Sequence, residues 1–345
     1  MEPVEVIADD TIDYLTEKVE NEPEVDMKPI LQGFTLDSIS RVAFGMTTNV
    51  RRGQDKEFAD IAFDVFDQFI PKNVFMTGMF HLLFLFPGIA TLFPVWPESA
   101  QKIRKMAHDI MVEREAKDIN AGDFVDRLRE YKKVAEPPIT HDMIDAQSMV
   151  FMTAGFETTA NTLTSMMLYF ANHPDLQDKA YDEIMACIGD DDKITHEHIK
   201  DMNYLEAFIM ETLRVKPPVV EHDRVCVKDC EVKGIKIKKG TSIQMPVYAA
   251  HYDEEFFPEP HVFNPDRFLK ENEDKIIPYT WRPFGAGNRV CIGQRFALME
   301  IKIFIAKLLQ KFQIVKTEKT SLETPSGTLF LITHSNAFVK LESRN

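Results

Sequence analysis

The feature that most constrains this fold is one long helix, predicted for residues 141–171. The proline-containing break at 137–140 precedes it, with Thr140 suited to cap its first turn, and Asn172-His173-Pro174 ends it. At about 1.5 Å per residue the helix extends roughly 45 Å, which is long enough to cross a domain. Because positions 149–169 are apolar on most faces, we expect the helix to be buried among other elements.

The rest of the chain predicts further helices and little sheet. Periodic apolar positions favour helices at about 9–21, 28–45, 56–70 and 203–215, and more polar helices are expected at about 98–117 and 122–133. Alternating residues favour short strands within 225–247 and again after 313. No convincing linker, internal repeat or low-complexity tract divides residues 1–345, so we expect a single domain that is mainly α with small β-sheets.

Composition limits the partners and the compartment. A net charge of −15 argues against nucleic acid as the main partner. Four cysteines are too few for a disulfide framework, which favours a reducing compartment. Cys226 and Cys230 have C-x-x-x-C spacing, but no second cysteine or histidine pair lies nearby to complete a zinc site, so we interpret them as strand residues.

Two stretches bear on contact with a membrane. The amino terminus, Met1-Glu2-Pro3-Val4-Glu5, has no basic region and no long apolar run, so no signal peptide or anchor is visible in this chain. Residues 74–96 are rich in Phe and Leu and long enough to span a bilayer, but Pro87, Pro94 and two glycines interrupt them. We expect buried packing or peripheral membrane contact through 74–96 rather than a transmembrane helix.

One loop near the carboxyl end combines the features of a metal-bound thiolate: Phe284-Gly285-Ala286-Gly287-Asn288-Arg289-Val290-Cys291-Ile292-Gly293. Its glycines let backbone N–H groups approach the Cys291 sulfur, and Arg289 offers positive charge to an anionic cofactor. A helix predicted up to about 312 follows, and its positive end favours the thiolate form of the cysteine. A cysteine in a glycine turn is usually inert, so the neighbouring residues carry this interpretation.

A second segment stands in the middle of the long predicted helix: Ala154-Gly155-Phe156-Glu157-Thr158-Thr159. Glycine inside a helix costs about 1 kcal/mol relative to alanine, so Gly155 needs a reason. Close approach of a flat ligand and close approach of another helix are both possible reasons, and the segment alone favours the helix crossing. A threonine hydroxyl that bonds its own helix can bend it and leave a gap.

The loop matches the pattern F-x-x-G-x-R-x-C-x-G at all five fixed positions, and the chain thereby resembles the cytochrome P450 family. The small-Gly-x-acid-Thr segment, the pair Glu211 and Arg214 with E-x-x-R spacing, and the meander motif at 263–268 precede the loop in that family's order. The resemblance implies a haem cofactor with Cys291 as the axial iron ligand. It also implies that Arg289 pairs with a haem propionate and that Phe284 shields the sulfur.

The resemblance gives the mid-helix segment a role on the oxygen side of the haem. Ala154 and Gly155 would lie against the cofactor. Thr158 would donate a hydrogen bond at the oxygen site, and Glu157 would help to relay protons from solvent, because cleaving the O–O bond consumes protons in a largely apolar pocket.

Three more charged residues acquire a structural role through the same resemblance. Glu211, Arg214 and Arg267 would form a buried triad, whose disruption leaves uncompensated charge. Arg224 stands where the family has another propionate-binding arginine, although a contact with Asp223 is an equal alternative.

The implied activity is that of a eukaryotic microsomal monooxygenase, which inserts one oxygen atom from O2 into a lipophilic substrate at the endoplasmic reticulum membrane. Electrons would come from a separate NADPH-dependent flavoprotein reductase, because no dinucleotide-binding fingerprint is evident here. One alternative is a haem-thiolate isomerase or dehydratase, which Glu157 and Thr158 argue against because such chemistry needs no proton relay. Another is a non-catalytic truncated remnant that binds haem weakly.

One motif of the family has no match in this chain. The motif W-x-x-x-R supplies a propionate clamp, but Trp96 is followed by Ala100 and Trp281 by Gly285 at the arginine position. We therefore expect the chain to lack the amino-terminal part of the family's fold, as a fragment or a truncated gene product.

Overall fold

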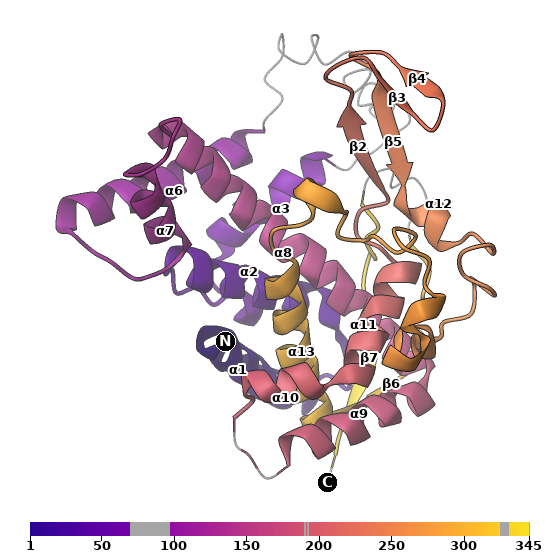
Figure 1. Cartoon of the computed structure of the whole chain (residues 1–345). Coiled ribbons are helices and arrows are strands. Elements are labelled where there is room, and N and C mark those ends of the chain that lie inside the picture. Colours follow the sequence, from indigo (N-terminus) through magenta and orange to yellow (C-terminus); the bar gives the residue numbers. More distant parts are fainter. Residues whose placement is uncertain (70–96, 190, 192, 325–330, 345) are drawn as a thin grey trace.

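The computed structural model is mostly helical, and it describes the chain outside residues 70–96, 190, 192, 325–330 and 345 (Figure 1). The described helices are α1 (Glu2–Val19), α2 (Met27–Phe44), α3 (Lys56–Phe69), α6 (Glu98–Lys117), α7 (Phe124–Lys132), α8 (His141–Asn172), α9 (Pro174–Ile188), α10 (His196–Asp201), α11 (Asn203–Val215), α12 (Val247–His251) and α13 (Gln294–Lys311). Short 3-10 turns are η1 (Val50–Arg52), η2 (Pro265–Phe268), η3 (Lys270–Lys275) and η4 (Gly287–Arg289).

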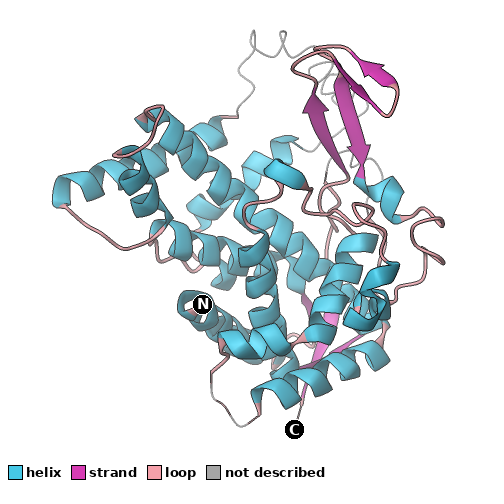
Figure 2. Cartoon of the chain, in the orientation of Figure 1, coloured by secondary structure: helices cyan, strands magenta, loops and turns pink. Residues whose placement is uncertain are grey.

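The described strands form three small antiparallel sheets (Figure 2). They are β1 (Glu24–Asp26), β7 (Phe338–Ser343) and β6 (Phe312–Val315) in that order, β2 (Glu221–Val225) with β5 (Ser242–Pro246), and β3 (Cys230–Val232) with β4 (Ile235–Ile237). Lys233 and Gly234 have positive φ angles and make the tight turn between β3 and β4. Figure 1 shows the β2–β5 sheet and the β3–β4 ribbon projecting together from the helical body. The expected class, mainly α with small sheets, is confirmed.

The long helix α8 runs through the middle of the molecule (Figure 1). The Thr140 hydroxyl caps it by accepting a hydrogen bond from the Met143 N–H at 3.2 Å. Helix α2 packs along it, and a Cβ added at Gly155 would lie only 2.8 Å from Cγ1 of Ile39 in α2. Gly155 thus makes room for the helix crossing that the sequence favoured.

Two clusters of buried apolar side chains meet at α8. One joins the carboxyl-terminal half of α8 to α1, α9, α11 and α13, and the other joins its amino-terminal half to α3 and α6. Helix α2 contributes to both clusters, and Phe296 near the start of α13 packs against both. Because α13 is anchored in this way, the cysteine loop that precedes it is attached to a well-packed helix.

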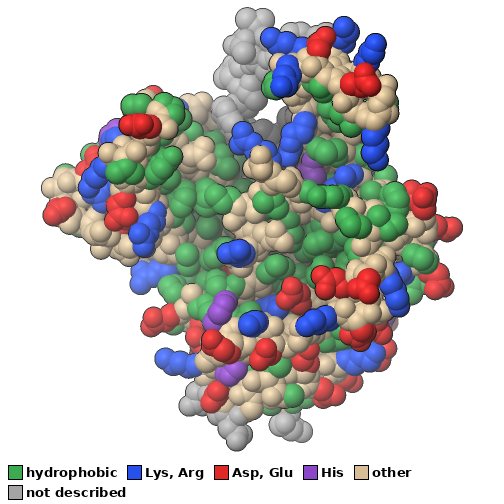
Figure 3. All heavy atoms as spheres, in the orientation of Figure 1, with side chains coloured by type: hydrophobic (Ala, Val, Ile, Leu, Met, Phe, Trp, Pro, Cys, Tyr) green, Lys and Arg blue, Asp and Glu red, His purple; other side chains and the backbone are tan. Residues whose placement is uncertain are grey.

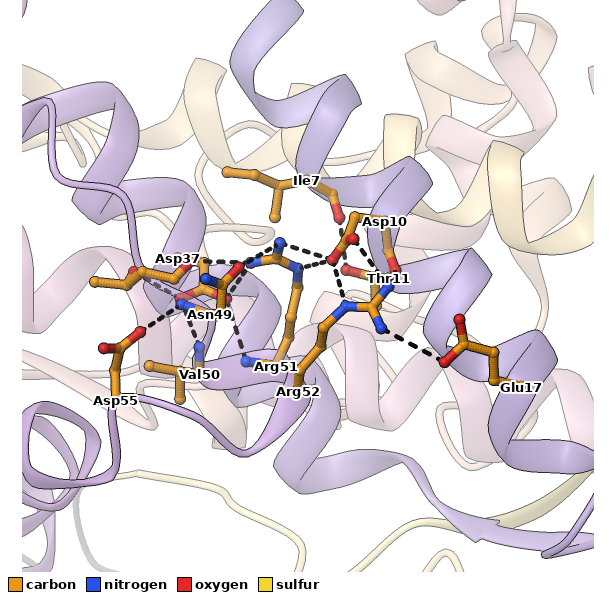
Figure 4. Close-up of polar contacts among 11 residues, drawn as sticks. Ile7, Asp10, Thr11, Glu17, Asp37, Asn49, Val50, Arg51, Arg52 and Asp55 are labelled. Atoms are coloured by element: carbon orange, nitrogen blue, oxygen red, sulfur yellow. Dashed lines mark hydrogen bonds and ion pairs between the residues drawn. The ribbon is translucent and has the colours of Figure 1, made fainter.

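A buried ion cluster fastens η1 to α1 and α2 (Figure 4). The Arg51 guanidinium contacts Asp37 at 2.6 Å and Asp10 at 2.7 Å, and the Asp37 side chain is fully buried. The Asp37 carboxylate also accepts hydrogen bonds from the Thr48 hydroxyl and the Val50 N–H at 2.6 and 3.0 Å. With its charge and lone pairs matched in this way, the buried carboxylate is tolerated.

We predict that Gly33→Ala destabilises the protein by about 1–3 kcal/mol. An added Cβ would lie 2.4 Å from Cα and 2.5 Å from N of Arg51, so backbone atoms of η1 would have to move. Gly155→Ala is the matched comparison and should cost less, because the atoms nearest its new methyl are side-chain atoms of Ile39 rather than backbone atoms. Urea unfolding compares the two variants. Equal losses in both would show that η1 is not tightly held against α2.

No helix in the described part of the chain is long and apolar enough to cross a membrane. The stretch 74–96, for which we expected buried packing or peripheral membrane contact, lies outside the described residues.

Candidate functional site

The cysteine loop presents Cys291 on the surface just before α13. The Cys291 N–H donates to the Phe284 carbonyl at 2.8 Å, which closes the loop across its width. Gly285 and Gly287 have φ angles of +76° and +69°, a region that residues with a Cβ rarely adopt. A Cβ at Gly287 would meet nothing within 4 Å. The loop therefore needs its glycines for backbone shape, and it leaves the cysteine sulfur accessible.

Phe284 ties the loop to the helices behind it. It is half-buried, and its ring lies 6.4 Å, centroid to centroid, from the Trp281 ring in an edge contact. The Trp281 indole N–H donates to the Met210 carbonyl in α11 at 3.1 Å. The candidate iron ligand is thus connected to α11, which carries Glu211 and Arg214 of the candidate triad.

The two candidate propionate-binding arginines are both exposed. Arg289 lies in η4, inside the loop, and Arg224 lies on β2. Arg224 donates from Nη1 to the backbone carbonyl of Asp223 at 2.7 Å, so its contact with that residue involves the main chain. Both guanidinium groups are accessible to an anionic group.

On α8, Ala154 and Thr158 lie on the accessible side of an otherwise buried helix. Met143, Gln147, Val150 and Ala154 form an exposed stripe, and Thr158 one turn further is half-buried. The Thr158 hydroxyl donates to the Ala154 carbonyl at 2.9 Å, the local bond that can bend a helix. A flat ligand approaching this stripe would meet Ala154 and Thr158 first.

Glu157, on the same helix, is buried, with only 6% of its surface exposed. Its carboxylate accepts hydrogen bonds from the Gln32 amide at 2.9 Å and the Asn161 amide at 3.2 Å. Gln32 was not predicted as a site residue. No signal in the sequence singles out Gln32, because the predicted helix holds several other polar residues.

Glu211, Arg214 and Arg267, which the resemblance groups as a triad, lie close together in the structure. Arg214 binds Glu211 through two hydrogen bonds, from Nε at 2.7 Å and Nη2 at 2.8 Å, and both side chains are completely buried. Arg267 Nε is 3.7 Å from the same carboxylate, and the Asn264 N–H donates to it at 2.8 Å. Burial raises the pKa of Glu211, and these donors, led by Arg214, offset part of that effect.

His251 joins the triad to the cysteine loop, and sequence reasoning missed it. Its carbonyl accepts from Arg214 Nη1 at 2.9 Å, its Nδ1 lies 3.0 Å from the Arg214 carbonyl, and its Nε2 accepts from the Arg282 N–H at 3.1 Å. These partners require a neutral ring protonated on Nδ1. Burial lowers the pKa of His251 to about 4, so the ring is neutral at neutral pH.

Comparison with known proteins identifies the family. The family model described as "Cytochrome P450" matches residues 1–341 of the chain. The chain belongs to the cytochrome P450 family. Among its relatives, cytochrome P450 3A11 of Mus musculus and cytochrome P450 3A2 of Rattus norvegicus are each 32% identical over 333 residues, or 92% of this chain. Cytochrome P450 3A6 of Oryctolagus cuniculus is 31% identical over 343 residues, or 96% of this chain.

The chain is shorter than these cytochromes P450. It spans 65% of the length of the mouse and rat proteins and 68% of the rabbit protein.

The haem of cytochromes P450 fits the residues described here. A thiolate is a ligand suited to haem iron, and Cys291 is exposed, with open space beside Gly287 in its loop. Two accessible arginines supply charge for carboxylates, and α8 exposes the small residue Ala154, which a flat macrocycle could approach closely. Sulfur ligand, cationic groups and small-residue surface are thus all available to the cofactor.

Proposed function

We propose that this chain is the haem-binding portion of a monooxygenase, which inserts one oxygen atom from O2 into a lipophilic substrate. The observation that carries the proposal is the exposed Cys291, held on a hydrogen-bonded loop and connected through Trp281 to the buried triad. The haem, when bound, supplies the oxygen-activating chemistry, which electron donation from a thiolate favours.

The chain's own residues have separate tasks in this proposal. Cys291 ligates the iron, Phe284 shields the sulfur, and Arg289 and Arg224 bind the propionates. The Thr158 hydroxyl, at the accessible edge of α8, donates a hydrogen bond on the side of the haem where oxygen binds. Glu157, buried on the same helix, helps to relay protons from solvent, and hydrogen bonds from Gln32 and Asn161 fix its carboxylate.

The proposed setting follows from this chemistry. A separate NADPH-dependent flavoprotein reductase supplies the electrons, and the endoplasmic reticulum membrane concentrates a lipophilic substrate. Glu211, Arg214 and Arg267 serve as a structural triad, since Glu211 and Arg214 are completely buried and Arg267 contacts the same carboxylate.

We predict that the haem-reconstituted, reduced and carbon-monoxide-treated chain shows the red-shifted Soret band of thiolate ligation, and that Cys291→Ala abolishes it. The physical reason is that the band depends on an anionic sulfur ligand, which alanine cannot supply. Cys187→Ala is the matched control, because that half-buried cysteine lies in α9, outside the site. A red-shifted band that persists in Cys291→Ala would exclude this residue as the ligand.

Turnover then separates the reaction classes. Oxygenated product that forms only with reductase, NADPH and O2 supports the monooxygenase. Rearrangement of an organic peroxide without reductase would instead indicate an isomerase. A chain that takes up no haem at all would contradict the proposal at its first step.

A further inference from the structure

Two cysteines outside the haem site lie side by side where the two-stranded β2–β5 sheet meets the β3–β4 hairpin. The Sγ atoms of Cys226 and Cys230 are 3.7 Å apart. Cys226 directly follows β2, and Cys230 is the first residue of β3, where it pairs with Ile237 of β4. The contact therefore joins two separate pieces of sheet.

The two thiols differ in access. Cys226 is buried, with 9% of its surface exposed, and its thiol donates a hydrogen bond to the Lys228 carbonyl at 2.9 Å. Its backbone is fixed as well, since its N–H donates to Thr241 and its carbonyl accepts from Gly240 at 2.7 Å. Cys230 is exposed. A small reagent in solution would therefore react first with Cys230, because Cys226 beside it is buried.

The surroundings of Cys230 attract an anionic thiol reagent. Five lysines of the ribbon and its flanks are exposed, and Figure 3 shows basic side chains gathered there; they are Lys228, Lys233, Lys236, Lys238 and Lys239. Positive charge favours the reactive thiolate form of cysteine and the approach of an anionic disulfide. Against this, the neighbouring Cys226 thiol raises the pKa of the Cys230 thiol, which makes the exchange slow at neutral pH.

We propose that Cys226 and Cys230 form a redox modification site, which closes to a disulfide by exchange with an oxidised low-molecular-weight thiol such as glutathione disulfide. The Cys230 thiolate attacks one sulfur of the reagent, forms a mixed disulfide and releases one glutathione thiolate. The Cys226 thiolate then attacks the Cys230 sulfur and releases the second. Two protein thiols are oxidised, one disulfide is reduced to two thiols, and the two thiol protons pass to the two released glutathiones.

The geometry makes the second step short. A disulfide bond is about 2.05 Å long, so the two sulfur atoms have to approach by roughly 1.7 Å. The exposed Cys230 side chain can cover that distance while Cys226 stays fixed by its backbone hydrogen bonds. The product would link the ribbon covalently to the end of β2, two residues beyond Arg224. This inference does not depend on the proposed monooxygenase activity.

The test treats the full chain with oxidised glutathione and maps the products after tryptic digestion without reduction. Trypsin cleaves after Lys228, which lies between the two cysteines, so only a disulfide keeps both peptides together. We expect wild type to lose the mass of two hydrogen atoms, to yield this linked pair, and to recover both thiols with excess reduced glutathione. Cys226→Ser should instead retain one glutathione on Cys230, and Cys230→Ser should leave Cys226 unmodified.

Three results would overturn the site. The first is a lasting glutathione adduct on wild-type Cys230 without the linked pair. The second is linkage of Cys226 or Cys230 to Cys187 or Cys291. The third is equal modification of Cys226 in the Cys230→Ser variant, which would show that Cys226 does not depend on Cys230.

Discussion

Glu211→Ala should cost about 3–5 kcal/mol of folding stability, enough to unfold the chain or to prevent haem uptake. The substitution leaves the Arg214 guanidinium completely buried without its carboxylate partner. It also removes the acceptor of the Asn264 N–H and the charge opposite Arg267. Urea unfolding followed by circular dichroism measures the loss, and haem titration measures the consequence for the site.

A matched control exists in the same chain. Glu130 and Arg127 in α7 have the same three-residue spacing and a contact of 3.3 Å, but more than half of each side chain is exposed. Glu130→Ala should therefore change stability by less than about 1 kcal/mol. Glu211→Gln keeps the shape and an acceptor for Asn264 but loses the charge, so we expect a loss between the two. A Glu211→Ala protein with wild-type unfolding midpoint and normal haem spectra would rule out a structural role for the triad.

Helical spacing predicted that Glu211 and Arg214 lie close together, whereas the triad with Arg267 followed only from the resemblance to the family. Glu211 and Arg214 are three apart in a helix whose bounds, Asn203–Val215, agree with the predicted 203–215. The long helix could be predicted equally well, because Thr140 and Pro174 mark its ends in the sequence. Such elements are specified by neighbouring residues, so one sequence is enough to place them.

Other predictions failed at proline residues, because a proline can either end a helix or occupy the first turn of one. Pro174 was taken only as a stop, yet it also occupies the first turn of α9, where its missing N–H costs nothing. Helix α1 begins at Glu2 rather than near residue 9, with Pro3 in its first turn. The sequence did not predict the roles of Gln32 and His251, because their hydrogen-bond partners are distant in the chain.

The burial of a carboxyl group on α13 was also not predicted from the sequence. Glu300 is completely buried, and neither of its carboxyl oxygens has a hydrogen-bond partner among the described residues. The Phe34 and Phe304 rings, 4.6 Å apart, pack nearby between α2 and α13 within one apolar cluster. Burial raises the pKa of Glu300 well above its usual value, and the Ser38 hydroxyl of α2 offsets a smaller part. The folded protein therefore holds Glu300 as a neutral acid over a pH range in which the unfolded chain ionises it.

Glu300→Gln should make the protein more stable than wild type as the pH rises above about 4.5, the usual range of a glutamate pKa. In that range unfolding of wild type releases the Glu300 proton, so its stability falls by about 1.4 kcal/mol per pH unit until the folded pKa is reached. Glutamine has nearly the same shape and no proton to lose, so the difference between variant and wild type isolates this slope. Urea unfolding from pH 4 to pH 8 measures it, with Glu318→Gln, on the exposed surface, as the control. A difference that stays constant with pH would mean that Glu300 is ionised in the folded protein, and the pKa of its carboxyl would then not be raised by burial.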